Sequence, residues 1–293
     1  MNIAVIGAGG QLGRELTGYL PAFADWKVRG FKSAEIDVVD RDAVFGKLQE
    51  AEPEVVINCA AFHRVDLCET QVARAFAVNL TGARNVAEFC RAHGAGAVFI
   101  STNYVFDGLS RRPYLETDPA RPLSAYGWSK LAGETAVISA LEKHAVIRTC
   151  GLYGKAGTSG KAANFVETML GLARAGRPIR VVDDQICTPT STAELVRIIA
   201  GIIRSNAWGV FHATSVGECS WYEFAKKIFE LSGFDPDLKP VFSDEHGAAA
   251  ARPAYAVLEN ARLKELGVQG FRHWEEALAE YLGVAGCGAA ACV

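Results

Sequence analysis

The chain has 293 residues, of which half are hydrophobic and 22% are charged, with 30 Lys and Arg against 33 Asp and Glu. This balance excludes a mainly disordered chain, and the length is enough for one large domain or one domain with a smaller lobe. A net charge of −3 without a run of five like charges excludes the electrostatic footprint of a nucleic-acid or membrane-surface protein.

The cysteines and the first residues indicate the compartment. The eight cysteines include no C-x-x-C pair and lie among apolar neighbours, which predicts reduced core thiols, no metal site and a cytoplasmic location. The short apolar run Ile3–Ile6 has no basic residues before it and ends at glycines. It therefore predicts a buried strand, not a signal peptide or a membrane span.

Strands and helices alternate in the first half of the chain. Runs rich in Val, Ile, Phe and Ala predict buried strands at Ile3–Ile6, Lys27–Phe31, Glu54–Asn58, Ala97–Ser101 and Ala145–Arg148. Between these runs, apolar residues recur with helical spacing, and the longest such stretch extends from Ala73 to Cys90. The alternation predicts an α/β fold, a doubly wound parallel Rossmann sheet over residues 1–150.

The pattern changes from about Gly151 to loops and helices with weaker strands. Residues 151–283 are predicted to form mainly a smaller C-terminal α/β lobe that binds substrate, with the chain crossing back to the sheet. The last residues, 284–293, are all Gly, Ala, Val or Cys and are predicted to form a flexible tail. The predicted helices lie near 164–175, 191–203, 221–231 and 273–282, and the predicted strands near 179–182 and 209–213.

A glycine-rich turn follows the first predicted strand and opens the first predicted helix. Such a turn lets the backbone approach a pyrophosphate, whose charge is met by the N–H groups at the helix N-terminus. A turn that merely packs a helix on a strand has similar spacing, but the position in the first βα unit favours dinucleotide binding. The predicted cofactor contacts are Gly7, Gly10, Gln11, Leu12 and Gly13.

The end of the second predicted strand bears on which dinucleotide binds. No acidic residue stands where one would hold the ribose 2′-hydroxyl of NAD, and Lys32, or Arg29 if the register slips, could face a 2′-phosphate. The predicted cofactor is therefore NADPH, with NADH left open. Further predicted cofactor contacts are Asp37 and Val38 at the adenine, and the small residues Cys59, Ala60 and Ala61 where the nicotinamide nucleotide passes.

Three residues form the predicted catalytic group. Tyr126 and Lys130 are four residues apart and so share one face of a helix, and Thr102 ends the fourth predicted strand at the ligand-binding edge of the sheet. A phenol with a pKa of about 10 is a weak acid near neutrality, and a nearby ammonium lowers that pKa. Tyr126 would then protonate a ketone oxygen that Thr102 holds, while Lys130 also contacts the nicotinamide ribose.

With these motifs the chain resembles the extended short-chain dehydrogenase/reductase family, and within it the dTDP-4-dehydrorhamnose reductase branch, over nearly its whole length. The matching segments are 1–3, Gly7, 10–13, Glu15, 37–38, 58–61, 65–66, Glu69, 101–108, 126–127, 130–134, 184–185, 188–190, 252–253 and Leu258.

The resemblance implies reduction of the 4-keto group of a nucleotide-diphosphate sugar, giving dTDP-L-rhamnose, with Thr102, Tyr126 and Lys130 as catalytic residues. Arg252 suits a diphosphate because its guanidinium can form two hydrogen bonds at once, although it could equally cap a helix or pair with a carboxylate. The substrate-binding residues that the resemblance implies are Asn103, Val105, Asn164, Gln185, Trp221 and Arg252.

The chain departs from the family pattern where the sugar is expected. Asn103 replaces an aspartate, Cys150-Gly151 replaces a Ser-Trp pair, and Ala256 replaces a serine. These changes leave a different keto-sugar nucleotide open as the substrate. Glu15 and Glu194 match two magnesium-binding positions of some family members, but no third is found and no metal is predicted.

Two other functions stay open at this point. One is a sugar-nucleotide epimerase, which keeps the same tyrosine and lysine and retains its cofactor. The other is a non-catalytic NADP-binding regulatory subunit like that of methionine adenosyltransferase. A homodimer is also left open, since apolar helices flank the predicted sheet.

Overall fold

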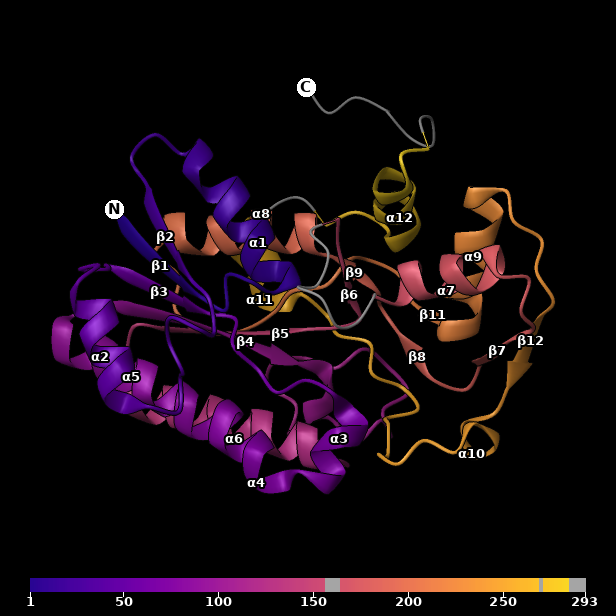
Figure 1. Cartoon of the computed structure of the whole chain (residues 1–293), viewed down its shortest axis with the longest axis horizontal. Helices are drawn as coiled ribbons and strands as arrows, with labels where there is room; N and C mark the ends of the chain where they lie inside the picture. The colour runs from indigo at the N-terminus through magenta and orange to yellow at the C-terminus, as the bar shows by residue number, and fades with distance from the viewer. Residues whose placement is uncertain (156–163, 269–270, 285–293) are drawn as a thin grey trace.

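The computed structural model describes residues 1–155, 164–268 and 271–284. At its centre is a six-stranded parallel sheet in the order β10-β5-β4-β3-β1-β2 (Figure 1). The predicted doubly wound α/β fold is therefore confirmed. The strands are β1 Asn2–Ile6, β2 Lys27–Phe31, β3 Val55–Asn58, β4 Gly96–Thr102, β5 His144–Thr149 and β10 Gly209–His212.

Helices cover both faces of this sheet (Figure 1). Burial on both faces explains why β1, β3, β4 and β5 appear in the sequence as nearly continuous apolar runs. The helices on one face are α1 Gln11–Tyr19 with the short helix η1 Leu20–Ala22, α8 Thr192–Arg204 and α11 Ala261–Glu265. The helices on the other face are α2 Arg41–Gln49, α5 Gly82–His93 and α6 Ala125–Ala140. Two short helices, α3 Val65–Thr70 and α4 Val72–Phe76, lie beside α6.

A smaller lobe lies at one end of the sheet, beside the carboxyl ends of the strands (Figure 1). Its own core packs α7, α9 and α12 together around buried residues such as Phe224 and Tyr153. Its elements are β6 Leu152–Tyr153, α7 Phe165–Arg174, β7 Ile179–Val182, β8 Ile186–Cys187, β9 Thr190–Ser191, β11 Cys219–Ser220, α9 Trp221–Ser232, β12 Leu238–Val241, α10 Ser243–His246 and α12 Trp274–Leu282.

The second half of the chain contributes to both parts of the molecule. Helix α8 packs on α1 and β10 pairs with β5, so this stretch belongs to the main sheet and its cover, whereas α7 and α9 lie in the lobe. The division at about residue 150, with crossings back to the sheet, stays a prediction. The predicted tail, 284–293, lies outside the described residues except for Val284.

The predicted helical stretch from Ala73 to Cys90 is not one helix. It is divided into α4, a π-helical turn η2 at Ala77–Thr81, and α5. The buried Asn79 in this turn donates to the Phe62 carbonyl oxygen and accepts from the Phe62 N–H, at 3.1 and 2.9 Å. These hydrogen bonds of Asn79 explain why the chain departs from regular α-helical geometry here. A π-turn accommodates a residue that a regular α-helix would direct elsewhere.

Within the described residues, no helix combines the length and the apolar character that crossing a membrane requires.

Candidate active site at the carboxyl edge of the sheet

The glycine turn after β1 fits closely against the segment after β3. Gly7 has a positive φ of 80°, and a Cβ there would lie 3.0 Å from the Ala60 nitrogen and the Cys59 carbonyl carbon. At Gly13 a Cβ would lie 2.3 Å from the Gly7 carbonyl oxygen. Two of the predicted cofactor-binding segments are thus brought into contact, and both glycines are required for the backbone to pass so closely.

The N-terminus of α1 opens at this turn. Its N-cap, Gly10, has no side-chain cap, and no acidic residue stands in the first turn. The N–H groups and the positive end of the helix dipole are therefore suited to a phosphate group. Gln11, the first residue of the helix, donates to the Leu152 carbonyl oxygen at 3.2 Å, and the buried Leu12 anchors the turn in the core.

The end of β2 lies beside the same turn. The N–H groups of Gly7 and Ala8 donate to the Phe31 carbonyl oxygen at 2.9 and 3.0 Å, so the next residue, Lys32, stands at the rim with its side chain exposed. Arg29 is engaged elsewhere, because its guanidinium lies 3.6 Å from the Glu50 carboxylate. Of the two predicted cations, Lys32 is the one that lies at the rim of the glycine turn.

Of the two residues predicted to lie at the adenine of the cofactor, one is exposed and the other is buried. Asp37 is exposed, and its carboxylate accepts from the Val39 N–H at 3.0 Å. Val38 is buried against Gly82, where an added Cβ would lie 2.6 Å from the valine side chain. Asn85 of α5 fixes this segment by donating to the Val38 carbonyl oxygen at 2.9 Å.

The three predicted catalytic residues gather where β4 ends. Thr102 is the last residue of β4, and its hydroxyl lies close enough to the Tyr126 phenol to lower the pKa of that group. Tyr126 and Lys130 lie on successive turns of α6, which Ser124 caps by accepting from the Gly127 N–H at 3.2 Å. Gly127 allows α6 to approach closely, because a Cβ there would lie 2.3 Å from the Tyr104 carbonyl oxygen.

The pKa values of the two titratable members are set mainly by burial. Burial raises the pKa of Tyr126 to about 12, although the hydrogen bond with Thr102 works in the opposite direction. The prediction that Lys130 lowers the pKa of the phenol is therefore wrong for this structure, and Tyr126 is fully protonated near neutrality. Burial also lowers the pKa of Lys130 to about 8, and its Nζ donates to the Ile100 carbonyl oxygen at 2.6 Å.

Asn79 is a supporting residue that the sequence analysis missed. Its Nδ2 donates to the Ser129 hydroxyl at 2.8 Å, and that hydroxyl donates to the Tyr126 carbonyl oxygen at 2.8 Å. The π-turn thereby braces the turn of α6 that carries the phenol. An asparagine between Val78 and Leu80 in an apolar helical stretch was the signal available in the sequence.

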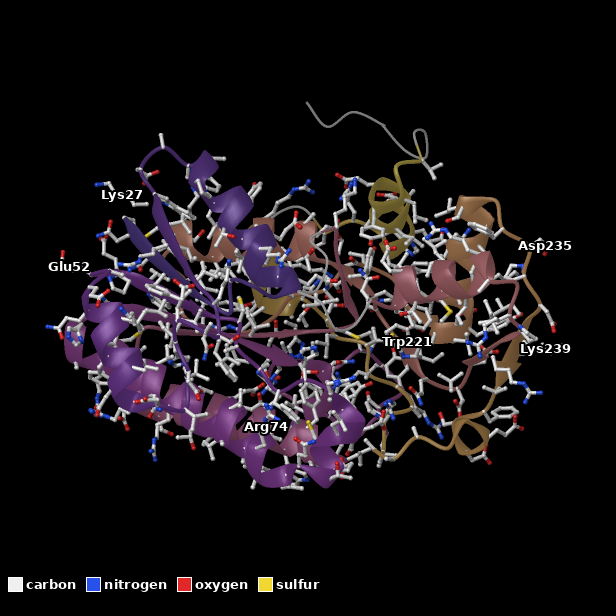
Figure 2. All side chains as sticks on the ribbon, in the orientation of Figure 1. Lys27, Glu52, Arg74, Trp221, Asp235 and Lys239 are labelled. Carbon is white, nitrogen blue, oxygen red and sulfur yellow. The ribbon has the colours of Figure 1, made fainter. Side chains whose placement is uncertain are left out.

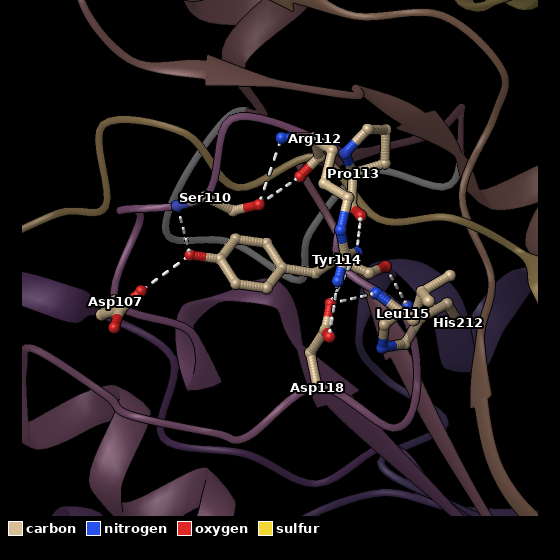
Figure 3. A network of polar contacts seen from close by, with 8 residues as sticks. All are labelled: Asp107, Ser110, Arg112, Pro113, Tyr114, Leu115, Asp118 and His212. Atoms are coloured by element: carbon tan, nitrogen blue, oxygen red, sulfur yellow. Dashed lines mark hydrogen bonds and ion pairs between the residues drawn. The ribbon is translucent and has the colours of Figure 1, made fainter.

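The loop after β4 is held by a network of polar contacts centred on Tyr114 (Figure 3). The Tyr114 hydroxyl donates to Asp107 at 2.7 Å and accepts from the Ser110 N–H at 3.1 Å. Arg112 and Asp118 form a pair of 2.9 Å hydrogen bonds across the same loop. Because this loop begins right after Thr102 and Asn103, the network fixes the backbone that follows two predicted site residues.

The departures from the family pattern meet in space. The buried Asn103 side chain donates to the Cys150 Sγ at 3.0 Å and to the Ala256 carbonyl oxygen at 3.2 Å. A Cβ at Gly151, which has a φ of +51°, would lie 3.2 Å from the Trp221 ring. Trp221 itself lies where the lobe meets the sheet domain (Figure 2). The substitutions at residues 103, 150, 151 and 256 thus form one connected region.

The other predicted substrate contacts are spread around this region. Arg252 pairs with the Asp66 carboxylate at 2.8 Å, the alternative that the sequence left open, and these bonds hold the pKa of Asp66 below its usual range. Asn164 caps α7 and donates to the Gln11 side chain at 3.1 Å, and Gln185 donates to the Ser243 hydroxyl at 2.7 Å.

Val105, a predicted substrate contact, and Glu194, a considered magnesium ligand, lie in the interior of the protein. Val105 is fully buried in a cluster with Phe106 and Leu258, so its side chain supports the site from behind. Glu194 is buried too and accepts from the Ser215 hydroxyl at 2.7 Å and from Arg272 at 2.8 Å. In the described part of the chain, no group of three or more His, Cys, Asp or Glu is arranged to hold a metal ion.

Residues 1–286 match the protein family described as the RmlD substrate binding domain. The spore coat polysaccharide biosynthesis protein SpsK of Bacillus subtilis is 40% identical over 96% of both chains. The dTDP-4-dehydrorhamnose reductase of Streptomyces griseus is 40% identical over 94% of this chain and 91% of its own. A crystal structure of dTDP-4-dehydrorhamnose reductase from Bacillus anthracis in complex with NADP superposes with a TM-score of 0.91 at 38% identity, covering 96% of this chain and 98% of that one.

Proposed function

This chain belongs to the RmlD substrate binding domain family, and from that membership we propose that it is an NADPH-dependent reductase of the 4-keto group of a nucleotide-diphosphate sugar. The proposed reaction converts dTDP-4-dehydrorhamnose to dTDP-L-rhamnose. One observation carries the proposal. Thr102, Tyr126 and Lys130 lie together at the end of β4, in a chain that is 40% identical to the dTDP-4-dehydrorhamnose reductase of Streptomyces griseus.

The residues around the glycine turn fit a dinucleotide phosphate. A side chain at Gly7 would clash with the segment after β3, and one at Gly13 would clash with the backbone of the glycine turn itself. The uncapped N-terminus of α1 offers its N–H groups to the pyrophosphate. Lys32 would meet the 2′-phosphate at the rim. When bound, NADPH supplies the hydride for the reduction.

The protein's own residues would handle the proton. Tyr126 would donate its phenolic proton to the sugar's keto oxygen, and the raised pKa keeps that proton in place until it is needed. The Thr102 hydroxyl, which lies beside the same phenol, would hold the keto oxygen in line with the donor. Lys130 would contact the nicotinamide ribose with its ammonium group.

We propose that the sugar nucleotide lies between β4 and the smaller lobe. Asn103, Gln185, Trp221 and Arg252 come from both parts of the chain and would surround it, with Asn164 at the start of α7. Arg252 would exchange its Asp66 partner for the diphosphate, because a guanidinium binds either anion with two hydrogen bonds. Another keto-sugar nucleotide is the second candidate, supported by the connected substitutions around Asn103, Cys150 and Gly151.

The test is NADPH oxidation followed at the nicotinamide absorbance, with enzymatically generated dTDP-4-dehydrorhamnose as the substrate. Steady turnover that consumes one NADPH per product supports the reductase. An epimerase would form product without net NADPH consumption, and a regulatory subunit would bind NADPH without forming product. Turnover restricted to a different dTDP-4-keto sugar would support the second candidate.

The choice of cofactor is predicted to depend on Lys32. In Lys32→Glu, a carboxylate replaces the cation that faces the 2′-phosphate, beside Glu35, whose carboxylate accepts from the residue 32 N–H at 2.8 Å. A hydrogen bond to a charged group contributes about 1.5–3 kcal/mol, so the affinity for NADPH should fall about tenfold or more while that for NADH is kept. Dissociation constants from the quenching of protein fluorescence measure both.

The control for this change is Lys27→Glu. Lys27 is also exposed and begins the same strand, five residues earlier. It therefore lies at the amino end of β2, away from the glycine turn. It should leave both affinities unchanged. Equal preference for NADPH in Lys32→Glu and the wild type would contradict the assignment of Lys32.

We further propose that the protein works in a reducing compartment, the cytoplasm. The cysteines of the described residues, which exclude Cys287 and Cys292, are all free thiols. The homodimer stays a prediction.

A further inference from the structure

Helix α6 carries a third charged residue on the face that holds Tyr126 and Lys130. Glu134 follows Lys130 by four residues, so the three side chains lie on successive turns of one face. Glu134 is 1% exposed, as is Lys130. A carboxylate so deeply buried requires hydrogen-bond partners that compensate for the loss of water. These partners link Glu134 to the candidate site.

Two neighbouring strands supply these partners. Arg148 of β5 donates to both Glu134 oxygens, with Nη2 at 2.7 Å and Nε at 3.0 and 3.2 Å, and is itself buried. Ser101 of β4 donates its hydroxyl to Oε1 of the same carboxylate. Ser101 directly precedes Thr102, so Glu134 ties the catalytic helix to the catalytic end of β4.

The surroundings of Lys130 contain few groups that can balance its charge. Its Nζ lies 4.0 Å from the centre of the Phe99 ring and donates to the Ile100 carbonyl oxygen. Two groups act on it electrostatically, Glu134 on its own helix and Cys59 after β3. Burial raises the pKa of the Cys59 thiol to about 12, which leaves that group neutral and Glu134 as the negative charge that favours the ammonium.

The other titratable groups near Glu134 are Arg148 and, beyond it, His212. Arg148 brings a second buried cation from β5, and His212 of β10 lies beside that arginine. Burial, followed by the charge of Arg148, lowers the pKa of His212 to about 3, so the imidazole is neutral near pH 7. The buried charged residues that surround Glu134 are therefore two cations, Lys130 and Arg148.

We infer that Glu134 is a positioning residue of the proposed reduction, which keeps Lys130 charged on the face of α6 that bears Tyr126 and fixes the end of β4 through Ser101. This inference rests on the proposed function but concerns a residue that touches neither cofactor nor substrate. It explains why a carboxylate is buried between α6 and the sheet, close to Lys130 and Arg148.

The test compares Glu134→Gln with Arg148→Met and with the double variant. Glutamine keeps the shape of the side chain and removes the charge that sustains the Lys130 ammonium. The pKa of Lys130 should fall by about one unit or more, since a nearby opposite charge produces shifts of that size. The alkaline limb of the kcat/KM profile should move to lower pH by the same amount, because the ammonium loses its proton earlier.

The other two variants separate this role from a structural one. Arg148→Met breaks the same ion pair but keeps the carboxylate, so its alkaline limb should not move to lower pH. The double variant removes both buried charges and so avoids leaving Arg148 uncompensated, which destabilises proteins strongly. It keeps the test valid where Glu134→Gln alone fails to fold, and its alkaline limb should again move to lower pH.

A direct readout is the titration of Lys130 by nuclear magnetic resonance, with lysine labelled with carbon-13 at Cε and the signal assigned by its absence in Lys130→Met. Glu88→Gln, on the neighbouring α5, serves as a control, since this glutamate is partly exposed and pairs with Arg41 and Arg84. It should leave both readouts unchanged.

An unaltered Lys130 titration in folded Glu134→Gln and in the double variant would overturn the inference. A wild type that does not oxidise NADPH with any dTDP-4-keto sugar would overturn the proposed function instead. The two failures are distinguishable, because the titration does not depend on turnover.

Discussion

Tyr126→Phe is expected to bind NADPH as the wild type does and to turn over at least about 100-fold more slowly, since a positioned proton donor contributes about 10²- to 10⁴-fold. The substitution removes the hydroxyl that lies beside Thr102 and keeps the ring, which packs edge-on against Tyr104 with centroids 5.8 Å apart. Single-turnover rates of NADPH oxidation, together with the dissociation constant for NADPH, measure the two effects separately.

The pH dependence of the wild type follows from the same phenol. Because the pKa of Tyr126 is raised, the acid form of this residue persists across the neutral range and activity should not decline through deprotonation of Tyr126 below about pH 10. The earlier alkaline decline should therefore follow Lys130, whose pKa lies at about 8. Lys130 loses its ammonium charge as the pH rises through that value.

The matched control for Tyr126→Phe is Tyr19→Phe, which removes a hydroxyl from an exposed tyrosine on α1 that packs against Phe23. It should leave turnover and binding unchanged. Wild-type turnover in Tyr126→Phe would show that the proton comes from another group and would remove the central residue of the proposed mechanism.

Gly13→Ala is expected to weaken NADPH binding and to destabilise the fold. The new Cβ would lie 2.3 Å from the Gly7 carbonyl oxygen and 2.8 Å from the Ala8 Cα, and both of these are backbone atoms that cannot rotate away. The start of α1 must shift from β1, which should weaken NADPH binding about tenfold or more and cost about 1–3 kcal/mol in the free energy of unfolding. Fluorescence titration and urea denaturation measure these changes.

Gly18→Ala provides the control on the same helix. A Cβ at Gly18 would meet nothing within 4 Å, and alanine favours a helix over glycine by up to about 1 kcal/mol. This variant should therefore be as stable as the wild type or slightly more stable, with unchanged NADPH affinity. If both variants bound NADPH equally well, the close approach at Gly13 would have no part in holding the cofactor.

The larger part of the fold was predictable from local patterns. The apolar runs of β1, β3, β4 and β5 are nearly continuous because these strands are buried on both faces, and such runs are visible without any tertiary information. The glycine turn and the four-residue spacing of Tyr126 and Lys130 were visible for the same reason. Each depends on the geometry of a single turn or helix.

The smaller lobe was less predictable. Strand β12 at Leu238–Val241 has mostly exposed or half-exposed residues and forms only by pairing with β7, so the sequence alone carries little sign of it. The break at η2 likewise depends on Asn79 finding partners in Phe62 and Ser129, which are 17 and 50 residues away in the chain.

By itself the sequence determined the parallel sheet, the glycine turn and the spacing of the proposed catalytic side chains, because spacing along one chain fixes which residues share a turn, a face or a strand end. Only the tertiary structure decided their electrostatics. Burial reversed the expected shift in the pKa of Tyr126, and the contact of Glu134 with Arg148 depends on how α6 packs over β4 and β5. Desolvation and long-range ion pairs arise from packing, and no local pattern encodes them.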